Sequence, residues 1–448
     1  MVKKIFKGIL IFLVAIIFLI GIGDFLWINL PKISARKNIS DIEDYGKMVS
    51  EINLDDHVRL VGLGEATHGN SDFQDLKLEV LKTLVEKNNL KSFAIEADFG
   101  EGMMINNYIH GNKREENISR IFSFNIYHTK NMNDLINYMF DYNQKVKAED
   151  KLSFYGFDMQ NPEKSIELIL DFCKENNILE DKNLQEEFSF IKDEKFKISE
   201  IKDKEDLLLE IKAHADALSS NYAREVSRAI KNVMDSVNYY KLDFNDYAKA
   251  NNVRDKFMAE NVKWISDFER SKGNDLLLIS GHNGHLAKSG KFYEPMGSHL
   301  KKIFGEKYFI IGTDFYKGIV NINEVGSSNK RSNHGFVSAD PLAYSARKFK
   351  GKYYLDFTKV KDGETSELIN KEINMGSLGE GYSPLMKFMP RSYRVKEVPK
   401  DLYDAMIFVY YAKPIAVTYE DWVYKLLAKI DDDKLIIFAI NRRQRRNI

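Results

Sequence analysis

The sequence has almost no cysteine: Cys173 is the one cysteine among 448 residues, and no C-x-x-C motif occurs. A disulfide needs two cysteines, so an intrachain disulfide framework is excluded, and so is a structural zinc site built on cysteines. Cys173 lies in a segment with helical hydrophobic periodicity (residues 166–177), where a lone cysteine is typical of a small buried apolar residue. The cysteine content therefore gives no indication of a thiol nucleophile.

Several signatures of other enzyme classes are missing as well. The sequence contains no G-x-S-x-G motif, so a serine nucleophile elbow has no support. It contains no P-loop and no strand-linked G-x-G-x-x-G, which argues against nucleotide and dinucleotide chemistry. The formal net charge is +0, so no overall field attracts a polyanion, and we expect no nucleic-acid partner.

The longest apolar run lies near the N-terminus, at residues 8–23, and three lysines precede it. Asp24 interrupts the run, and residues 25–30 extend it to a length that suits a membrane span. A secretory signal is the alternative interpretation, but no small-residue cleavage site follows closely. The sequence thus predicts an uncleaved anchor over residues 1–30 and a linker over 31–53. The protein would be a single-pass protein of the cell membrane whose catalytic part lies outside the cytoplasm.

From residue 54 onward, apolar strand patterns alternate with helical patterns, which is typical of an α/β domain. The stretch from about 161 to 273 is charged and helical throughout, and we interpret it as a helical insertion. The prediction is a three-layer α/β domain over residues 54–448 with a central, largely parallel sheet, preceded by the transmembrane helix. Strands are expected at residues 59–63, 92–95, 152–157, 275–280, 307–313, 318–322, 352–356 and 405–411.

Four of these strands run directly into titratable residues. In an open parallel sheet, ligands bind outside the carboxyl ends of the strands, so these side chains should converge on one crevice. Carboxylates and imidazoles that converge are what general acid–base catalysis requires. The six residues are Glu65 and His68 of GEATHG, Glu96, Asp158, and His282 and His285 of GHNGH.

The surroundings of these residues leave two chemistries open. A carboxylate three residues from an imidazole fixes its tautomer and raises its basicity, as Glu65 would for His68. Glu96 at the end of an apolar strand needs a partner, for which Lys77 and His68 are the candidates. The same histidines and acids also suit a zinc or iron ion, although no H-E-x-x-H motif occurs.

The order of motifs carries a resemblance. GLGEATHGNSDF, FAIEAD, YGFDMQ, RDKFMAENVKWI, SGHNGHLAK and MGSHL follow one another between about residues 54 and 412. This series resembles the erythromycin esterase family, which includes proteins of succinoglycan biosynthesis. The resemblance implies an α/β fold and hydrolysis of an ester, in the best-known members a macrolide lactone, by water and without a metal or other cofactor. It implies that His68 is the general base, with Glu65, Glu96, His282 and His285 as its catalytic partners.

Other positions are expected to hold the substrate or the network. Lys77 stands where the family usually has an arginine, and a lysine keeps the charge but loses the bidentate geometry. Arg254 lies on one helical stripe with apolar residues and would line the pocket. The predicted substrate-binding residues are Lys77, Asp158, Arg254 and Asn283.

The sequence therefore predicts a hydrolase of a small-molecule ester. Two alternatives remain open at this point. One is a metal-dependent hydrolase of a phosphoester or of a glycan substituent. The other is a non-catalytic factor that handles cell-envelope polysaccharide.

Overall fold

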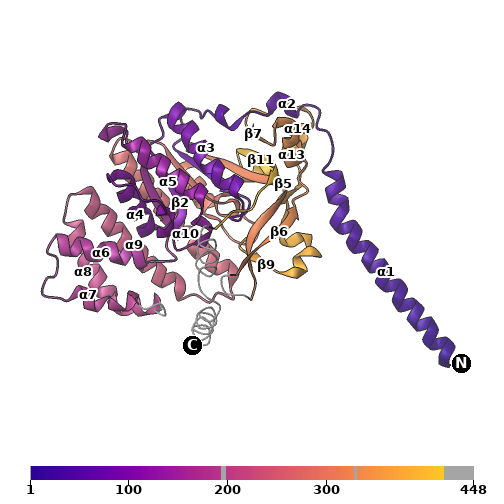
Figure 1. Cartoon of the computed structure of the whole chain (residues 1–448), viewed down its shortest axis with the longest axis horizontal. Helices are drawn as coiled ribbons and strands as arrows, with labels where there is room; N and C mark the ends of the chain where they lie inside the picture. Colours follow the sequence, from indigo (N-terminus) through magenta and orange to yellow (C-terminus); the bar gives the residue numbers. More distant parts are fainter. Residues whose placement is uncertain (1, 193–197, 327–329, 418–448) are drawn as a thin grey trace, which may run out of the picture.

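The protein is described by a computed structural model that covers residues 2–192, 198–326 and 330–417 (Figure 1). Its main sheet has nine strands, and a second sheet has two. The strands are β1 (Leu60–Glu65), β2 (Ser92–Asp98), β3 (Ser153–Asp158), β4 (Leu277–His282), β5 (Tyr308–Glu324), β6 (Arg331–Val337), β7 (Lys352–Asp356), β8 (Ile373–Gly376), β9 (Gly381–Tyr382), β10 (Arg394–Glu397) and β11 (Ala405–Ala412).

The helices lie on both faces of this sheet, except α1, which projects away from it (Figure 1). They are α1 (Val2–Ser34), α2 (Ile42–Tyr45), α3 (Ser71–Asn88), α4 (Phe99–His110), α5 (Lys130–Asn143), α6 (Glu163–Glu175), α7 (Leu184–Glu187), α8 (Glu205–Asp216), α9 (Asn221–Tyr240), α10 (Tyr247–Ser271), α11 (Asn283–Leu286), α12 (Met296–Phe304), α13 (Pro341–Ser345), α14 (Gly363–Ile369) and α15 (Pro399–Leu402).

The main sheet has the strand order β3-β2-β4-β1-β5-β11-β7. Neighbouring strands are parallel from β3 to β11, and β7 is antiparallel to β11. The hairpin strand β6 pairs antiparallel with the outer part of β5, and β9 pairs with the end of β5. The α/β prediction with a central, largely parallel sheet therefore agrees with the structure.

Side chains alternate along the strands between the two faces of the sheet, and each face has its own hydrophobic core. On β4, Leu277 and Ile279 face one core while Leu278 faces the other. The first core is completed by apolar residues of α6, α8, α9 and α10, and the second by those of α3 and α5. Because successive side chains of a strand point to opposite faces, a sheet covered on both faces needs apolar residues at every position. Each core strand in the centre is accordingly buried along its whole length.

Between residues 161 and 273, the described residues form helices and no strand, as expected for the helical insertion. The strands predicted at 307–313 and 318–322 are one strand, β5. They are joined because residues 314–317 continue the parallel ladder with β11, in which Asp314 pairs with Phe408 and Phe315 with Val409. Strands β6, β8, β9 and β10 were not predicted. Residues 418–448 of the predicted domain lie outside the described residues.

The prediction of a membrane-spanning N-terminal helix is wrong. Helix α1 continues unbroken through Asp24 and Pro31, so the apolar run is part of a longer element that also contains charged residues. In the part of the chain that the structure describes, no helix is both long enough and apolar enough to cross a membrane. This finding also overturns the predicted single-pass location with an extracytoplasmic catalytic part.

Candidate active site

Four neighbouring strands bring the predicted residues to one edge of the sheet. In the order β3-β2-β4-β1, the strands end near Asp158, Glu96, His282 and Glu65. Glu65 and His282 are direct partners in the ladder between β1 and β4. Gly281 permits the close approach of Glu96, because a Cβ atom at this position would lie 2.8 Å from a Glu96 carboxylate oxygen.

The first cluster joins His68 to a buried ion pair. His68 Nδ1 lies 2.7 Å from Glu65 Oε1, and the other Glu65 oxygen pairs with Lys77 Nζ. Burial would raise the pKa of Glu65, but Lys77 and His68 lower it to about 2. Burial would likewise lower the pKa of His68, but Glu65 raises it to about 9. The Glu65–His68 pair is therefore ionised at neutral pH, with His68 protonated.

The second cluster is held by Arg254 of α10. Its Nη2 donates to Glu96 Oε1 at 2.8 Å and to Asp158 Oδ2 at 2.6 Å. Burial would lower the pKa of Arg254, but the two carboxylates raise it well above the ordinary value. Glu96 is thus partnered by Arg254, not by Lys77 as the sequence suggested. One guanidinium joins the ends of β2 and β3 to α10.

His285 forms a second carboxylate–histidine pair. Its Nδ1 lies 2.8 Å and 2.9 Å from the two carboxylate oxygens of Asp255, one of which also accepts from the backbone N–H of Met296. Arg254 Nη1 donates to His285 Nε2 at 3.1 Å. Burial lowers the pKa of His285, whereas Asp255 and Glu96 raise it, and the net shift is upward. Both ring nitrogens of His285 are therefore engaged by protein groups.

His282 has the opposite character and lies between the other two histidines. Its ring centroid is 5.2 Å from that of His68 and 6.2 Å from that of His285. Burial, together with the charges of His68 and His285, lowers its pKa to about 4, so this ring is neutral. The backbone N–H of Gly284 donates to Nδ1, which leaves the ring proton on Nε2. Among the described residues, no side chain or backbone group hydrogen-bonds to this buried Nε2.

Asn283 follows His282 and ties the site to β5. Its amide exchanges two hydrogen bonds with the backbone of Thr313, at 2.7 Å and 3.2 Å. A Cβ atom at Gly64 would lie 2.1 Å from the Asn283 side-chain oxygen, so β1 needs a glycine here. The Asn283 amide thus positions the histidine loop against two strands.

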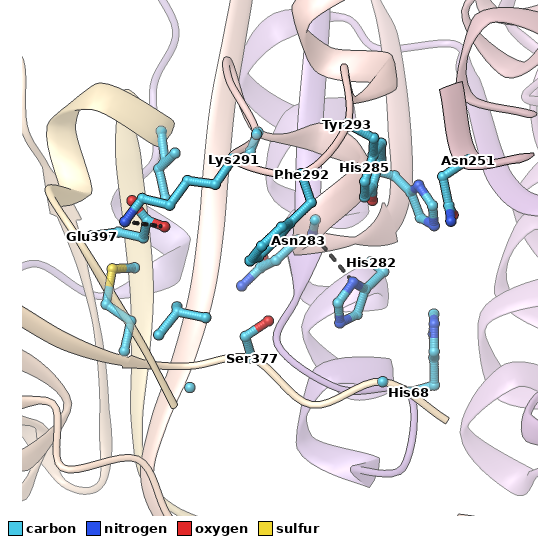
Figure 2. A pocket seen from close by; sticks show the side chains of 18 of the residues that line it. His68, Asn251, His282, Asn283, His285, Lys291, Phe292, Tyr293, Ser377 and Glu397 are labelled. Carbon is cyan, nitrogen blue, oxygen red and sulfur yellow. Dashed lines mark hydrogen bonds and ion pairs between the residues drawn. The ribbon is translucent and has the colours of Figure 1, made fainter. Parts of the chain in front are cut away.

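The clusters border a cavity of about 850 Å³ (Figure 2). Six of the nine predicted site residues line it: His68, Glu96, Arg254, His282, Asn283 and His285. The other three, Glu65, Lys77 and Asp158, are buried behind this lining and contact it through the pairs described above. Polar groups that converge in a pocket of this size are a common mark of an active site.

The donor arrangement does not favour a resident metal ion. His68 Nδ1 and both nitrogens of His285 are already bound to charged protein groups. In the described ranges, no three histidine, cysteine or acidic side chains are grouped so that they would hold an ion.

Sequence reasoning missed Asp255 and the aromatic lining. Asp255 directly follows Arg254 and is fully buried in α10, and a buried acid on an apolar helix stripe signals that it has a partner. Tyr293 and Phe292 also line the cavity, and they carry no motif by which the sequence alone would mark them.

Comparison with known proteins decides the family. The erythromycin esterase family model matches residues 85–411. The chain belongs to the erythromycin esterase family. Two curated relatives agree: erythromycin esterase type II of Escherichia coli is 24% identical over 319 residues, 63% of this chain and 73% of the relative. The putative hydrolase YbfO of Bacillus subtilis (strain 168) is 24% identical over 305 residues, 58% of this chain and 65% of the relative.

Solved structures share the fold. A Bacillus cereus protein has a TM-score of 0.70 at 19% identity and covers 86% of this chain and 99% of its own. A succinoglycan biosynthesis protein has a TM-score of 0.66 at 19% identity, with 84% and 97% covered. A mutant of the erythromycin esterase EreC in its open conformation has a TM-score of 0.60 at 16% identity, with 83% and 98% covered.

These findings confirm the family resemblance that the motifs carried. Family membership and the named relatives support an esterase or hydrolase. The matched range begins after the GEATHG segment, so the placement of Glu65 and His68 beside the other residues comes from the structure.

Proposed function

We propose that this erythromycin-esterase-family protein hydrolyses a carboxylic ester of a small molecule, with His68 activating the attacking water. One observation carries the proposal: His68 is bound through Nδ1 to the buried Glu65, and it borders the cavity across from the neutral His282. A carboxylate on one ring nitrogen and a reactant on the other is the arrangement in which a histidine moves protons.

In the proposed reaction, His68 first takes a proton from water and later returns it to the leaving alkoxide. Neutral His68 accepts a proton from water at Nε2 while the water oxygen bonds to the ester carbonyl carbon. The resulting tetrahedral oxyanion collapses, the carbon–oxygen bond of the alkoxide breaks, and the alkoxide takes the proton from His68. Because the pKa of His68 is about 9, its base form is about one molecule in a hundred at pH 7. The rate should therefore rise with pH up to about 9.

His282 is the donor that suits the oxyanion. Its proton is on Nε2, its low pKa keeps the ring neutral, and no described residue competes for this hydrogen. Removing one donor of an oxyanion hole typically costs about 10²–10³ in kcat. His285 is held between Asp255 and Arg254, so we assign it a positioning role.

Arg254 is assigned to the reactive site by its position. It is bound to Glu96, Asp158 and His285, and it lines the cavity. It would keep these groups in one geometry and add positive charge near the developing oxyanion.

The test is hydrolysis by the purified full-length chain. Erythromycin is the first substrate, because a relative carries that name, and a panel of simple acyl esters follows. Hydrolysis of a lactone adds one water to the mass, which mass spectrometry detects. We expect His68→Ala to reduce kcat/KM by about 10²–10⁴ on every substrate that the wild type cleaves.

His110→Ala is the matched control, since His110 is exposed on α4 away from the cavity. Full activity in His68→Ala, or an equal loss in His110→Ala, would contradict the assignment. Cleavage of acyl esters but not of erythromycin would keep the mechanism and exclude the macrolide.

A further inference from the structure

We infer that the cavity contains a second subsite, formed by Phe292 and the apolar side chains of β8, β10 and α15, which takes an apolar group of the ester substrate. That the ligand is an ester rests on the proposed function. The inference adds the substrate class, which is an ester with a bulky apolar group at a distance from the bond that breaks.

Phe292 is an aromatic residue without cover. Its side chain is 81% exposed, the highest value among the large hydrophobic residues that the structure describes as exposed. It is also one of the residues that line the cavity, so it borders both the cavity and solvent. In Figure 2 it lies between the Lys291–Glu397 pair and His282. An exposed aromatic ring at the border of a cavity offers apolar surface to a ligand that binds there.

The loop that carries Phe292 is held on both sides of this residue, which limits where the ring can lie. On one side, Lys291 pairs with Glu397 at 3.0 Å and donates to the backbone carbonyl of Lys396 at 2.8 Å. On the other side, the backbone N–H of Glu294 donates to the Asn252 side chain at 2.7 Å. Residues on either side of Phe292 are therefore anchored to different elements, β10 and α10.

A second part of the cavity wall carries several apolar side chains. It comes from the two-stranded sheet of β8 and β10 and from the short helix α15. Met375 and Tyr403 are buried, and the remaining side chains are half-buried. The apolar lining residues of this wall are Met375, Val395, Val398, Leu402 and Tyr403.

The charged residues that line this part of the cavity do not favour an anionic group. Its rim carries Glu372, Glu397 and Asp401 against Lys291 and Arg391. Lys291 is paired with Glu397, and Arg391 lies over the ring of Trp27 at 4.9 Å from its centroid. No excess of positive charge faces the subsite, so its ligand is uncharged or cationic and presents apolar surface to Phe292.

The experiment compares wild type with Phe292→Ala on two ester series, one with a lengthening acyl group and one with a lengthening alcohol. We expect kcat/KM for the largest apolar esters to fall by about tenfold or more in Phe292→Ala, mainly through KM. The smallest acetate ester should be cleaved as in the wild type. Phe388→Ala is the matched control, because Phe388 is 64% exposed and does not line the cavity.

A second measurement does not depend on catalysis. The neutral fluorescent probe N-phenyl-1-naphthylamine should bind the wild type and Phe388→Ala equally, and Phe292→Ala about tenfold more weakly. If the wild type cleaves no ester, the proposed function fails and this titration alone decides the subsite. Equal probe affinity in all three proteins, or a loss of ester cleavage that is the same for small and large esters, would overturn the inference.

Discussion

Neutralising Glu65 and neutralising Lys77 should shift the pH dependence of catalysis in opposite directions. Glu65 makes the largest contribution to raising the pKa of His68 from 6.5 to about 9 against the effect of burial, and Glu96 and Glu380 add smaller ones. The difference of about 2.5 units corresponds to about 3 kcal/mol at about 1.36 kcal/mol per unit. Glu65→Gln removes this contribution, and burial then lowers the pKa of His68 further. The midpoint of the acid limb in the pH profile of kcat/KM should therefore move from about pH 9 to about pH 6.5 or below.

Lys77→Met should do the reverse. Lys77 shares the Glu65 carboxylate with His68 and adds a buried positive charge nearby. Without it, the full carboxylate charge acts on His68, so the acid limb should move above about pH 9. The double variant Glu65→Gln/Lys77→Met removes one charge of each sign and leaves no buried charge of this pair without its partner. It should therefore follow the shift of Glu65→Gln without its loss of stability.

The assay is kcat/KM from about pH 5 to about pH 10.5 on one ester, with the His68 ring titration followed by NMR as a readout without substrate. The limb and the ring titration should move together in each variant. An acid limb that stays in place in Glu65→Gln, or that moves the same way in both single variants, would refute the reasoning. In that case His68 would not be the group whose proton controls the rate.

Three further predictions follow from the same contacts. Arg254→Lys keeps the charge but cannot bind two carboxylates and His285 at once, so kcat/KM should fall at least about tenfold and the melting temperature should drop. Asp255→Asn should lower the pKa of His285 and reduce kcat more than KM, measured as separate pH profiles of the two constants. The free energy of unfolding should contain a term of up to about 3 kcal/mol from His68, fully present below pH 6.5 and lost as pH rises through about 9, measurable by urea unfolding across that range.

The first two predictions each have a control on the same helix, α10. Asp267→Asn changes an acid on α10 whose side chain is 43% exposed, and it should leave both pH profiles unchanged. Arg270→Lys on the same helix should keep the melting temperature, since its side chain is 67% exposed. Stability that is flat between pH 6.5 and 9 would contradict the raised pKa of His68.

Much of the site was predictable because it follows from strand order. Glu65, Glu96, Asp158 and His282 each end an apolar strand, and parallel neighbours present their ends at one edge. The sequence needed no knowledge of helix packing to bring these four together. Strands β8, β9 and β10 were missed because they are two to four residues long. They also lie outside the buried centre of the sheet, so their apolar pattern is weak.

The pairing within the site was not predictable. Which cation meets which carboxylate depends on where α10 crosses the strand ends, and it brings Arg254 to Glu96 across 158 positions of the chain. The same crossing places Asp255 on His285. Neither periodicity nor spacing records a contact between elements so distant in sequence.

The sequence by itself determined the α/β class, the family and the set of acids and histidines at the sheet edge, because these depend on the local pattern and on the order of motifs. The tertiary structure decided their roles, because a pKa depends on burial and on charges that other elements supply. It set His68 against the buried Glu65, left His282 neutral with its Nε2 hydrogen available, and engaged both nitrogens of His285. It also overturned the predicted membrane span. The apolar run belongs to a longer helix that includes charged residues, and no described helix is both long enough and apolar enough to cross a membrane.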